Sequence, residues 1–406
     1  MRRYVIGVLA LSAMLFSLAV GFNWVVDPFD LWDSGRVTGL RFQKTEVLTQ
    51  LRLVQVNHAF SSPVDTAIIG TSRSGIGLDS AHPAFGRGRT YNLAMAAQPA
   101  AESAVLAQRL IAGGTKRIVW GLDFFAFDCY ASFLRDYEKN PLRVFDRSLP
   151  LFSISTLEAS MSTLYRRSDS GDSDSMSVRF MEDGHLRWSR NVLLGNKGHR
   201  ARAQRAEGGY LRSTYAPPFS LDCPNTGRIR PLEHYRGMLR LADRQGVGLR
   251  LFISPSHARL WETLAASGLW PMWEDWKREL VRINLEEAEK AGTSPFPIWD
   301  FSGFNSLTTE PFPLIGDTTE MHWYWESSHY KEALGNLVLG RVFDYVDSRR
   351  EVPRDFGVRI GAENLEAHLT RIREDRENWR IEHPDDVHEI QVAAARERRI
   401  PLQGHK

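Results

Sequence analysis

Short apolar runs and longer amphipathic stretches alternate along most of the chain. The short runs predict buried β-strands at residues 65–70, 90–93, 116–123, 247–253 and 296–300. The amphipathic stretches predict helices at residues 99–112, 232–244, 273–291 and 327–347. This alternation predicts a parallel sheet covered by helices on both faces. In such sheets the ligand site lies beyond the carboxyl ends of the strands.

The N-terminal stretch has a different pattern. Arg2 and Arg3 precede 23 uncharged residues, 4–26, and aspartates follow at once. A helix of that length measures about 34 Å, enough to cross a hydrocarbon layer of ~30 Å. The charge asymmetry predicts a single-pass anchor in a bacterial inner membrane, with the body in the periplasm or another extracytoplasmic space. A cleavable signal peptide is the alternative, but its apolar region is usually shorter, so an uncleaved anchor is favoured.

Two further stretches interrupt the alternation of strands and helices. Residues 130–230 read as an insertion between the third and fourth strands, with a loop rich in Ser, Asp and Gly at residues 168–177. Residues 350–406 are densely charged and predict solvated helices ending in a frayed tail. The expected organisation is therefore an anchor at residues 1–26, an α/β domain at residues 27–349 and a charged helical tail.

Composition narrows the class of protein. The 406 residues are 43% hydrophobic and 25% charged, which excludes a disordered chain and a polytopic membrane protein. The net charge of +2 gives no indication of nucleic-acid binding. Cys129 and Cys223 could pair outside the cytoplasm, although two free, buried cysteines are slightly favoured. No cofactor or metal is predicted, because His322 and His329 are seven residues apart and no nearby set has ligand-like spacing.

Two groups of reactive residues follow the predicted strands. Ser72 lies in a Gly-bounded turn after the first strand, where a helix start would offer N–H groups to an oxyanion. A simple helix cap is the alternative interpretation. Glu326 precedes His329 by three residues, at the predicted entrance of the last helix. A neutral His can take a proton from a hydroxyl, and a carboxylate can hold its tautomer. An exposed charge pair at a helix start is the alternative there.

Together these groups resemble the SGNH (GDSL-like) hydrolase superfamily. The resemblance is carried by Gly-Thr-Ser-Arg at 70–73, Tyr-Asn-Leu-Ala at 91–94, Gly-Leu-Asp at 121–123 and Glu-x-x-His at 326–329. It covers residues 65–125 and 247–345. It implies a flavodoxin-like three-layer α/β/α fold with sheet order 2-1-3-4-5 and an acyl-serine intermediate. The anchored layout resembles bacterial envelope proteins and the SGNH-like components of polysaccharide O-acetylation and D-alanylation systems.

The resemblance implies a catalytic set. Ser72 would be the nucleophile and His329 the general base. Glu326 stands where the family usually has Asp, and a longer side chain can still reach the imidazole. Asp300, at the end of the fifth strand, is a rival acid, with a plain turn residue as its alternative.

Five further residues are candidates for oxyanion or substrate contacts. Counting from Asn92, the resemblance places a backbone oxyanion donor at Ala97, where the family usually has Gly. Asp123 stands where the family has Asn. An ionised carboxylate would repel an oxyanion, so Asp123 must be protonated, turned away or used for another purpose. Arg73 could hold an anionic substrate group or lie exposed at the helix start. His257 could bind substrate or be structural.

The sequence thus predicts a membrane-anchored extracytoplasmic serine esterase or O-acyltransferase. Its acyl group, expected to be acetyl, would pass through Ser72 to water or to a hydroxyl of an envelope glycan. The alternative is a non-catalytic protein of the same fold that binds, or helps to assemble or export, a surface polysaccharide. A third hypothesis is a scaffold for a membrane-bound acyltransferase.

Overall fold

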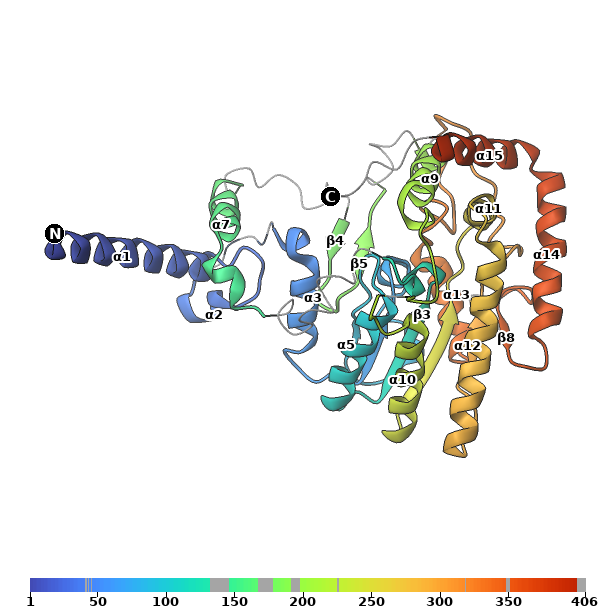
Figure 1. Ribbon diagram of the computed structural model, residues 1–406, viewed down its shortest axis with the longest axis horizontal. Helices are drawn as coiled ribbons and strands as arrows, with labels where there is room; N and C mark the ends of the chain where they lie inside the picture. The colour runs from blue at the N-terminus through green and yellow to red at the C-terminus, as the bar shows by residue number, and fades with distance from the viewer. Residues whose placement is uncertain are drawn as a thin grey trace.

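The computed structural model shows a long N-terminal helix projecting from an α/β body (Figure 1). It describes residues 1–40, 42, 44, 46–131, 146–166, 178–190, 198–224, 226–317, 319–347 and 351–399. The loop expected at residues 168–177 lies outside these ranges. Helix α1 (Arg2–Val26) is the one helix among the described residues that is long and apolar enough to cross a membrane. By length and composition it fits either an anchor or a signal sequence.

The body is built on a mainly parallel six-stranded sheet. Its strands are β1 (Thr66–Ile69), β2 (Thr90–Asn92), β3 (Arg117–Leu122), β6 (Gly248–Ile253), β7 (Ile298–Asp300) and β8 (Val358–Ile360). The order across the sheet is β2-β1-β3-β6-β7-β8. The first five strands are parallel and follow the predicted order, whereas β8 pairs antiparallel to β7.

Helices cover both faces of the sheet, because its strands carry apolar side chains on both sides. One face packs against α5 (Ala100–Ala112), α10 (Pro231–Arg244) and α12 (Trp270–Ala291), which lie side by side in Figure 1. The other face packs against α4 (Ser72–Gly77) and α13 (Glu332–Val342). The remaining short helices before β3 are α2 (Ser34–Thr38), η1 (Val47–Gln50), α3 (Leu51–Ala59) and η2 (Pro83–Phe85).

Residues 351–399 form helices, as expected, and also one strand of the sheet, whereas the expected frayed end at residues 400–406 lies outside the described ranges. Strand β8 completes the sheet, and α14 (Leu365–Glu382) and α15 (Pro384–Arg399) follow it. Helix α15 packs against α11 (Ala258–Ala266), an element that the sequence pattern did not predict. The high charge of this C-terminal segment does not keep it in solvent, because many of its charged side chains pair with opposite charges on the body. For example, Asp386 on α15 lies 2.5 Å from the fully buried Arg259 on α11.

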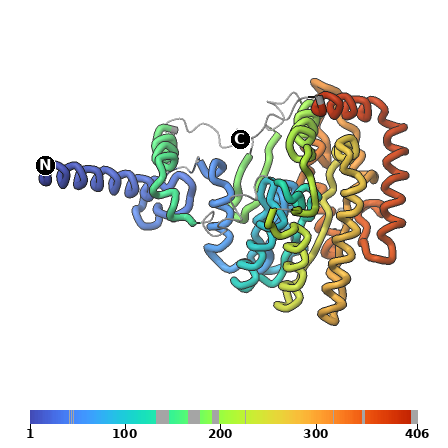
Figure 2. Tube along the Cα trace, viewed as in Figure 1, coloured from blue at the N-terminus to red at the C-terminus, as the bar shows by residue number. Residues whose placement is uncertain are grey.

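In its described residues, the insertion between β3 and β6 contributes no strand to the main sheet. It contains η5 (Leu149–Phe152), α7 (Ile154–Arg166), the hairpin of β4 (Val178–Phe180) and β5 (Leu186–Trp188), α9 (Gly198–Gly209) and the π-helix η8 (Tyr210–Thr214). Figure 2 shows it in green, reaching from α1 to the red C-terminal helices.

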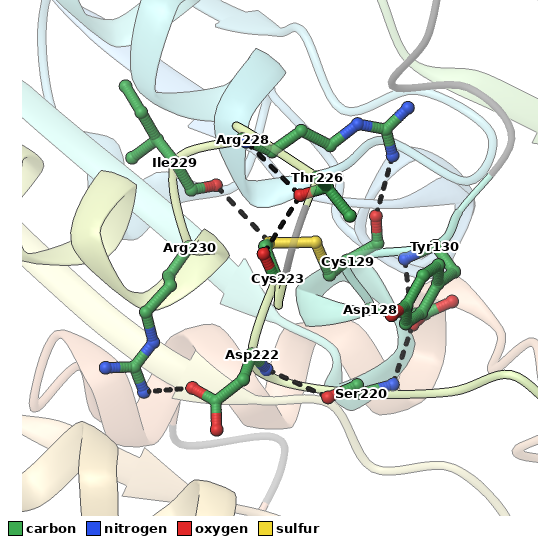
Figure 3. The surroundings of a disulfide bond; sticks show 10 residues. All are labelled: Asp128, Cys129, Tyr130, Ser220, Asp222, Cys223, Thr226, Arg228, Ile229 and Arg230. Carbon is green, nitrogen blue, oxygen red and sulfur yellow. Dashed lines mark hydrogen bonds and ion pairs between the residues drawn. A yellow bond between two sulfur atoms is a disulfide. The ribbon is translucent and has the colours of Figure 1, made fainter.

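A disulfide between Cys129 and Cys223 joins the two ends of this insertion (Figure 3). Cys129 follows η3 (Phe124–Phe127) just after β3, and Cys223 precedes α10. The Arg228 guanidinium donates to the carbonyl of Cys129 at 2.9 Å beside the bond. The preference for free cysteines was wrong, because both ends of the insertion return to the same edge of the body, which a sequence separation of 94 does not reveal.

Candidate functional site

The turn between β1 and α4 presents Ser72 at the carboxyl end of the sheet. Gly70 begins it with a φ of +141°, and a Cβ there would lie 2.8 Å from the carbonyl oxygen of Gly121. Only glycine fits such a conformation and such a close approach. Thr71 then caps α4 by accepting from the N–H of Arg73 at 3.3 Å. Ser72 is the first residue of the helix and stays partly exposed.

Ser72, His329 and Glu326 form one hydrogen-bonded chain. The Ser72 Oγ lies 2.8 Å from His329 Nε2, although the two residues are 257 positions apart. The His329 Nδ1 bonds to the Glu326 carboxylate. Glu326 also accepts the N–H groups of Ser328 at 2.7 Å and His329 at 3.0 Å. These bonds hold a turn, and α13 begins only at Glu332, so the helix predicted from residue 327 starts later and the pair lies in a loop.

The state of Glu326 suits it to orient His329. Burial opposes its charge, but His329 and the Ser328 N–H hold the pKa of this carboxyl below its usual value. An ionised Glu326 accepts a proton-bearing Nδ1 and leaves Nε2 free to accept from the Ser72 hydroxyl. The arrangement can therefore withdraw a proton from Ser72 and stabilise the imidazolium that results.

Asp300, the rival acid, serves a different partner. Its carboxylate contacts Lys277 Nζ at 2.6 Å and His368 Nε2 at 3.0 Å, and it also accepts from the Ser302 N–H at 2.9 Å. Burial opposes its charge, but Lys277 and His368 hold the pKa of Asp300 well below its usual range. Asp300 thus anchors the end of β7 to α12 and α14, and of the two acids it is Glu326 that contacts the imidazole of His329.

The Asp123 side chain is engaged by other residues. Of the three alternatives (a protonated carboxyl, a side chain turned away, or another use), the structure shows another use. One carboxylate oxygen lies 2.6 Å from Arg73 Nη1, and the other accepts from the Thr71 hydroxyl at 2.6 Å. Arg73 is only 2% exposed. It is therefore neither an exposed helix-start residue nor an unpaired cation for an anionic substrate, and its charge neutralises that of Asp123.

The Arg73 guanidinium also links the two halves of the site. It donates to the Tyr210 hydroxyl at 3.0 Å and to the Ser328 Oγ at 3.2 Å, and these two oxygens lie 2.7 Å apart. Arg73 follows Ser72 in the chain, and Ser328 precedes His329. The buried network therefore fixes the distance between the hydroxyl and the imidazole. Sequence reasoning missed Tyr210, since it lies in the insertion that was left without a role.

The candidate oxyanion donors are the backbone N–H groups of Ser72 and Ala97. Within the described part of the chain, neither the Ser72 nor the Ala97 N–H donates a hydrogen bond to another residue. Ala97 has a φ of +49°, a backbone conformation that glycine adopts more easily than other residues. Asn92 lies deeper: its amide donates to the carbonyls of Ser74 at 3.1 Å and Leu78 at 3.0 Å, so it positions the loop.

His257 is structural in this fold. It is buried, its Nδ1 accepts from the Arg259 N–H at 3.1 Å, and its Nε2 lies 2.7 Å from the Glu310 carbonyl. Burial lowers its pKa to about 3, so the ring is neutral at physiological pH. With both nitrogens occupied, it caps α11 and has no free atom for a substrate.

Trp188 is a second residue that the sequence did not single out. The hairpin β4–β5 brings its ring to 5.0 Å from the His329 ring, between centroids, and the Arg202 guanidinium lies 4.5 Å from the Trp188 ring. The indole thus forms one wall beside the imidazole. The sequence pointed to Trp188 only in that it is an aromatic residue within a largely polar insertion.

Comparison of the chain with models of protein families, with characterised proteins and with solved structures finds no match. Across the described ranges, no group of three or more His, Cys, Asp and Glu side chains could hold a metal ion. The function is therefore inferred from the geometry of the Ser72 site.

Proposed function

We propose that this protein is a membrane-anchored, extracytoplasmic serine esterase or O-acyltransferase of the SGNH type. The observation that carries the proposal is the hydrogen-bonded chain from Ser72 through His329 to the buried Glu326. A hydroxyl, a neutral imidazole and a carboxylate in this order are the parts that activate a serine nucleophile. The sheet order of the first five strands and the four sequence blocks support the family assignment.

In the proposed reaction, Ser72 Oγ attacks an ester carbonyl while His329 Nε2 takes its proton. The N–H groups of Ser72 and Ala97 stabilise the oxyanion of the tetrahedral intermediate. His329 then gives the proton to the leaving alcohol, and the C–O bond to that alcohol breaks. The acyl-Ser72 ester is cleaved in turn by water or by a glycan hydroxyl, whose proton passes to His329 and returns to Ser72.

The acyl group is proposed to be acetyl and the natural substrate a cell-envelope glycan. Both rest on the resemblance to polysaccharide O-acetylation components and on the extracytoplasmic location proposed for the body. The apolar helix α1 supports anchoring, and the Cys129–Cys223 disulfide supports an oxidising compartment. The buried side chains of Asn23 and Val26 join the end of α1 to the body, which favours retention of the helix.

The first test is hydrolysis of p-nitrophenyl acetate by the full chain in detergent. We expect Ser72→Ala to abolish turnover and Ser155→Ala, at an exposed position on α7, to leave it unchanged. An organophosphonate probe should label the wild-type protein at Ser72, and His329→Ala should lose that label. Equal turnover in wild type and Ser72→Ala would exclude simple hydrolysis by this site.

A non-catalytic glycan-binding protein is the second candidate. It is favoured by the engagement of Asp123 with Arg73 and Thr71, because the side-chain oxyanion donor that the family supplies at this position is missing. Such a protein would bind envelope polysaccharide equally well in the wild type and in Ser72→Ala, and the wild type would not react with the phosphonate. A scaffold for a membrane-bound acyltransferase would instead co-purify with that enzyme from detergent.

A further inference from the structure

The start of the insertion carries apolar side chains that face outward beside α1. They lie on η5 and α7, and we call them the 149–165 patch: Leu149, Phe152, Ile154, Met161, Leu164 and Tyr165. Ile154 is 75% exposed, Met161 61% and Tyr165 82%. Several exposed large apolar side chains in one short segment indicate a protein or membrane contact.

The distribution of polar and apolar side chains on α7 differs from that of a helix whose outer face lies in water. Its buried face is small and polar, with Thr156, Ser160 and Thr163 at spacings of four and three residues. Met161 and Tyr165, four residues apart, point outward instead, and Ser155 and Glu158 on the same helix are exposed as well. A buried face of small polar residues, with large apolar side chains among the exposed ones, is typical of a helix that packs on another helix within lipid. A helix bathed in water has the opposite arrangement.

This segment also packs directly on α1, and the partly exposed ring of Phe152 takes part in the contact. Phe152 stacks on Phe16 with ring centroids 5.9 Å apart. The Asn23 amide, buried in the apolar helix, donates to the Leu151 carbonyl at 3.0 Å and accepts from the Ser160 hydroxyl at 3.1 Å. An amide in an apolar environment is costly unless it is hydrogen-bonded, so α7 supplies what Asn23 requires there. In Figure 1, α7 runs across the direction of α1, beside its C-terminal end.

The contact with Phe16 sets the depth of the patch. Trp24 lies near the C-terminal end of α1, and Trp side chains prefer the level of the lipid headgroups. Phe16 is eight residues earlier, about 12 Å along the helix axis. A hydrocarbon layer is about 30 Å thick, so Phe16 lies within its outer half. The ring of Phe152 stacks on Phe16 with a centroid distance of 5.9 Å, so it lies within that distance of the level of Phe16.

We infer that the 149–165 patch is buried in the outer leaflet of the bilayer that holds α1. Helix α7 lies there as an interfacial helix, with Met161 and Tyr165 toward the acyl chains. The inference rests on the anchor of the proposed function and goes beyond it, because it adds a second membrane-bound element. The hairpin that follows α7 carries Trp188 to the site, so this element also ties the Ser72 site to the membrane surface.

The test measures the surroundings of spin labels on the full chain in phosphatidylethanolamine–phosphatidylglycerol vesicles. The two native cysteines form a disulfide, so a single introduced cysteine takes the label. Collisions with oxygen, which concentrates in lipid, are compared with collisions with a water-soluble nickel chelate. For Met161→Cys we expect an oxygen-to-nickel ratio several-fold higher than for Ser155→Cys, an exposed polar position on the same helix.

Every result of this experiment decides the inference. A nickel-accessible label at residue 161 would place the patch in water and overturn it. Low access to both reagents would mean that a second copy or another protein covers the patch, which also overturns it. Tyr165→Cys repeats the measurement if one substitution disturbs folding. Leu11→Cys, exposed on α1, tests the anchor separately: a water-accessible label there would remove the premise, whatever the esterase assay shows.

Discussion

Replacing Asp123 with Asn removes one charge from the buried Arg73–Asp123 pair while keeping the size of the side chain. In the native protein both groups are at most 2% exposed, and their atoms approach to 2.6 Å. Asp123→Asn would restore the residue type of the resembled family and leave the guanidinium of Arg73 without a counter-charge. The new amide could help to bind an oxyanion, whereas the unpaired guanidinium would lower the stability of the fold. Because Arg73 is buried, we expect the loss of stability to dominate.

The magnitude follows from the environment of Arg73. Removing one member of a buried ion pair costs about 3–5 kcal/mol, because the remaining charge stays desolvated. The Asn oxygen can still accept one hydrogen bond, so we expect the free energy of unfolding to fall by about 3 kcal/mol, the lower end of that range. Esterase turnover should fall as well, since Arg73 connects the neighbours of Ser72 and His329.

The assay is urea-induced unfolding of the full chain in detergent, followed by tryptophan fluorescence. The matched control is Asp128→Asn, because Asp128 is buried and accepts the N–H groups of Ser220 and Tyr130. That change should cost about 1 kcal/mol, the value of ordinary hydrogen bonds. The double variant Arg73→Met with Asp123→Asn should recover part of the loss, since no charge remains buried. A loss below about 1 kcal/mol for Asp123→Asn would refute the reasoning.

Three further predictions concern the site, the pH dependence and the disulfide. Glu326→Gln should lower kcat for p-nitrophenyl acetate by about 10⁴-fold with little change in KM, because an amide favours the wrong tautomer of the histidine. For His257, the unfolded chain takes up a proton near pH 6.5 and the folded protein only near 3. The free energy of unfolding should therefore fall as the pH drops through this window, by up to about 5 kcal/mol, and His257→Asn should flatten that part of a pH titration of urea unfolding. A slope that is unchanged in the variant would contradict the assignment of a neutral, buried ring. Exchanging Cys129 and Cys223 for Ser should lower the free energy of unfolding, measured in the same way, by about 4 kcal/mol, because the bond closes a loop with a separation of 94 residues. Equal stability of the variant and the wild type would show that the bond does not constrain the unfolded chain.

The sheet and the turn that holds Ser72 could be predicted because their signals are local. The apolar run that became β1 ends at Gly70, and glycine before a small hydroxyl residue predicts a tight turn wherever the rest of the chain lies. The order of the first five strands follows from the alternation of strands and helices together with the resemblance. The predicted start of the last helix at residue 327 was wrong, since the Glu326 carboxylate holds a turn there and α13 begins only at Glu332.

What the sequence determined by itself was the set of buried strands, the apolar N-terminal helix and the pairing of Ser72 with His329 as candidates. Only the tertiary structure decided between Glu326 and Asp300, engaged Asp123 with Arg73, joined Cys129 to Cys223 and placed β8 at the sheet edge. The reason is physical: burial periodicity depends on neighbouring residues, whereas the partner of a carboxylate or a cysteine depends on which distant segments the packed chain brings within a few ångströms.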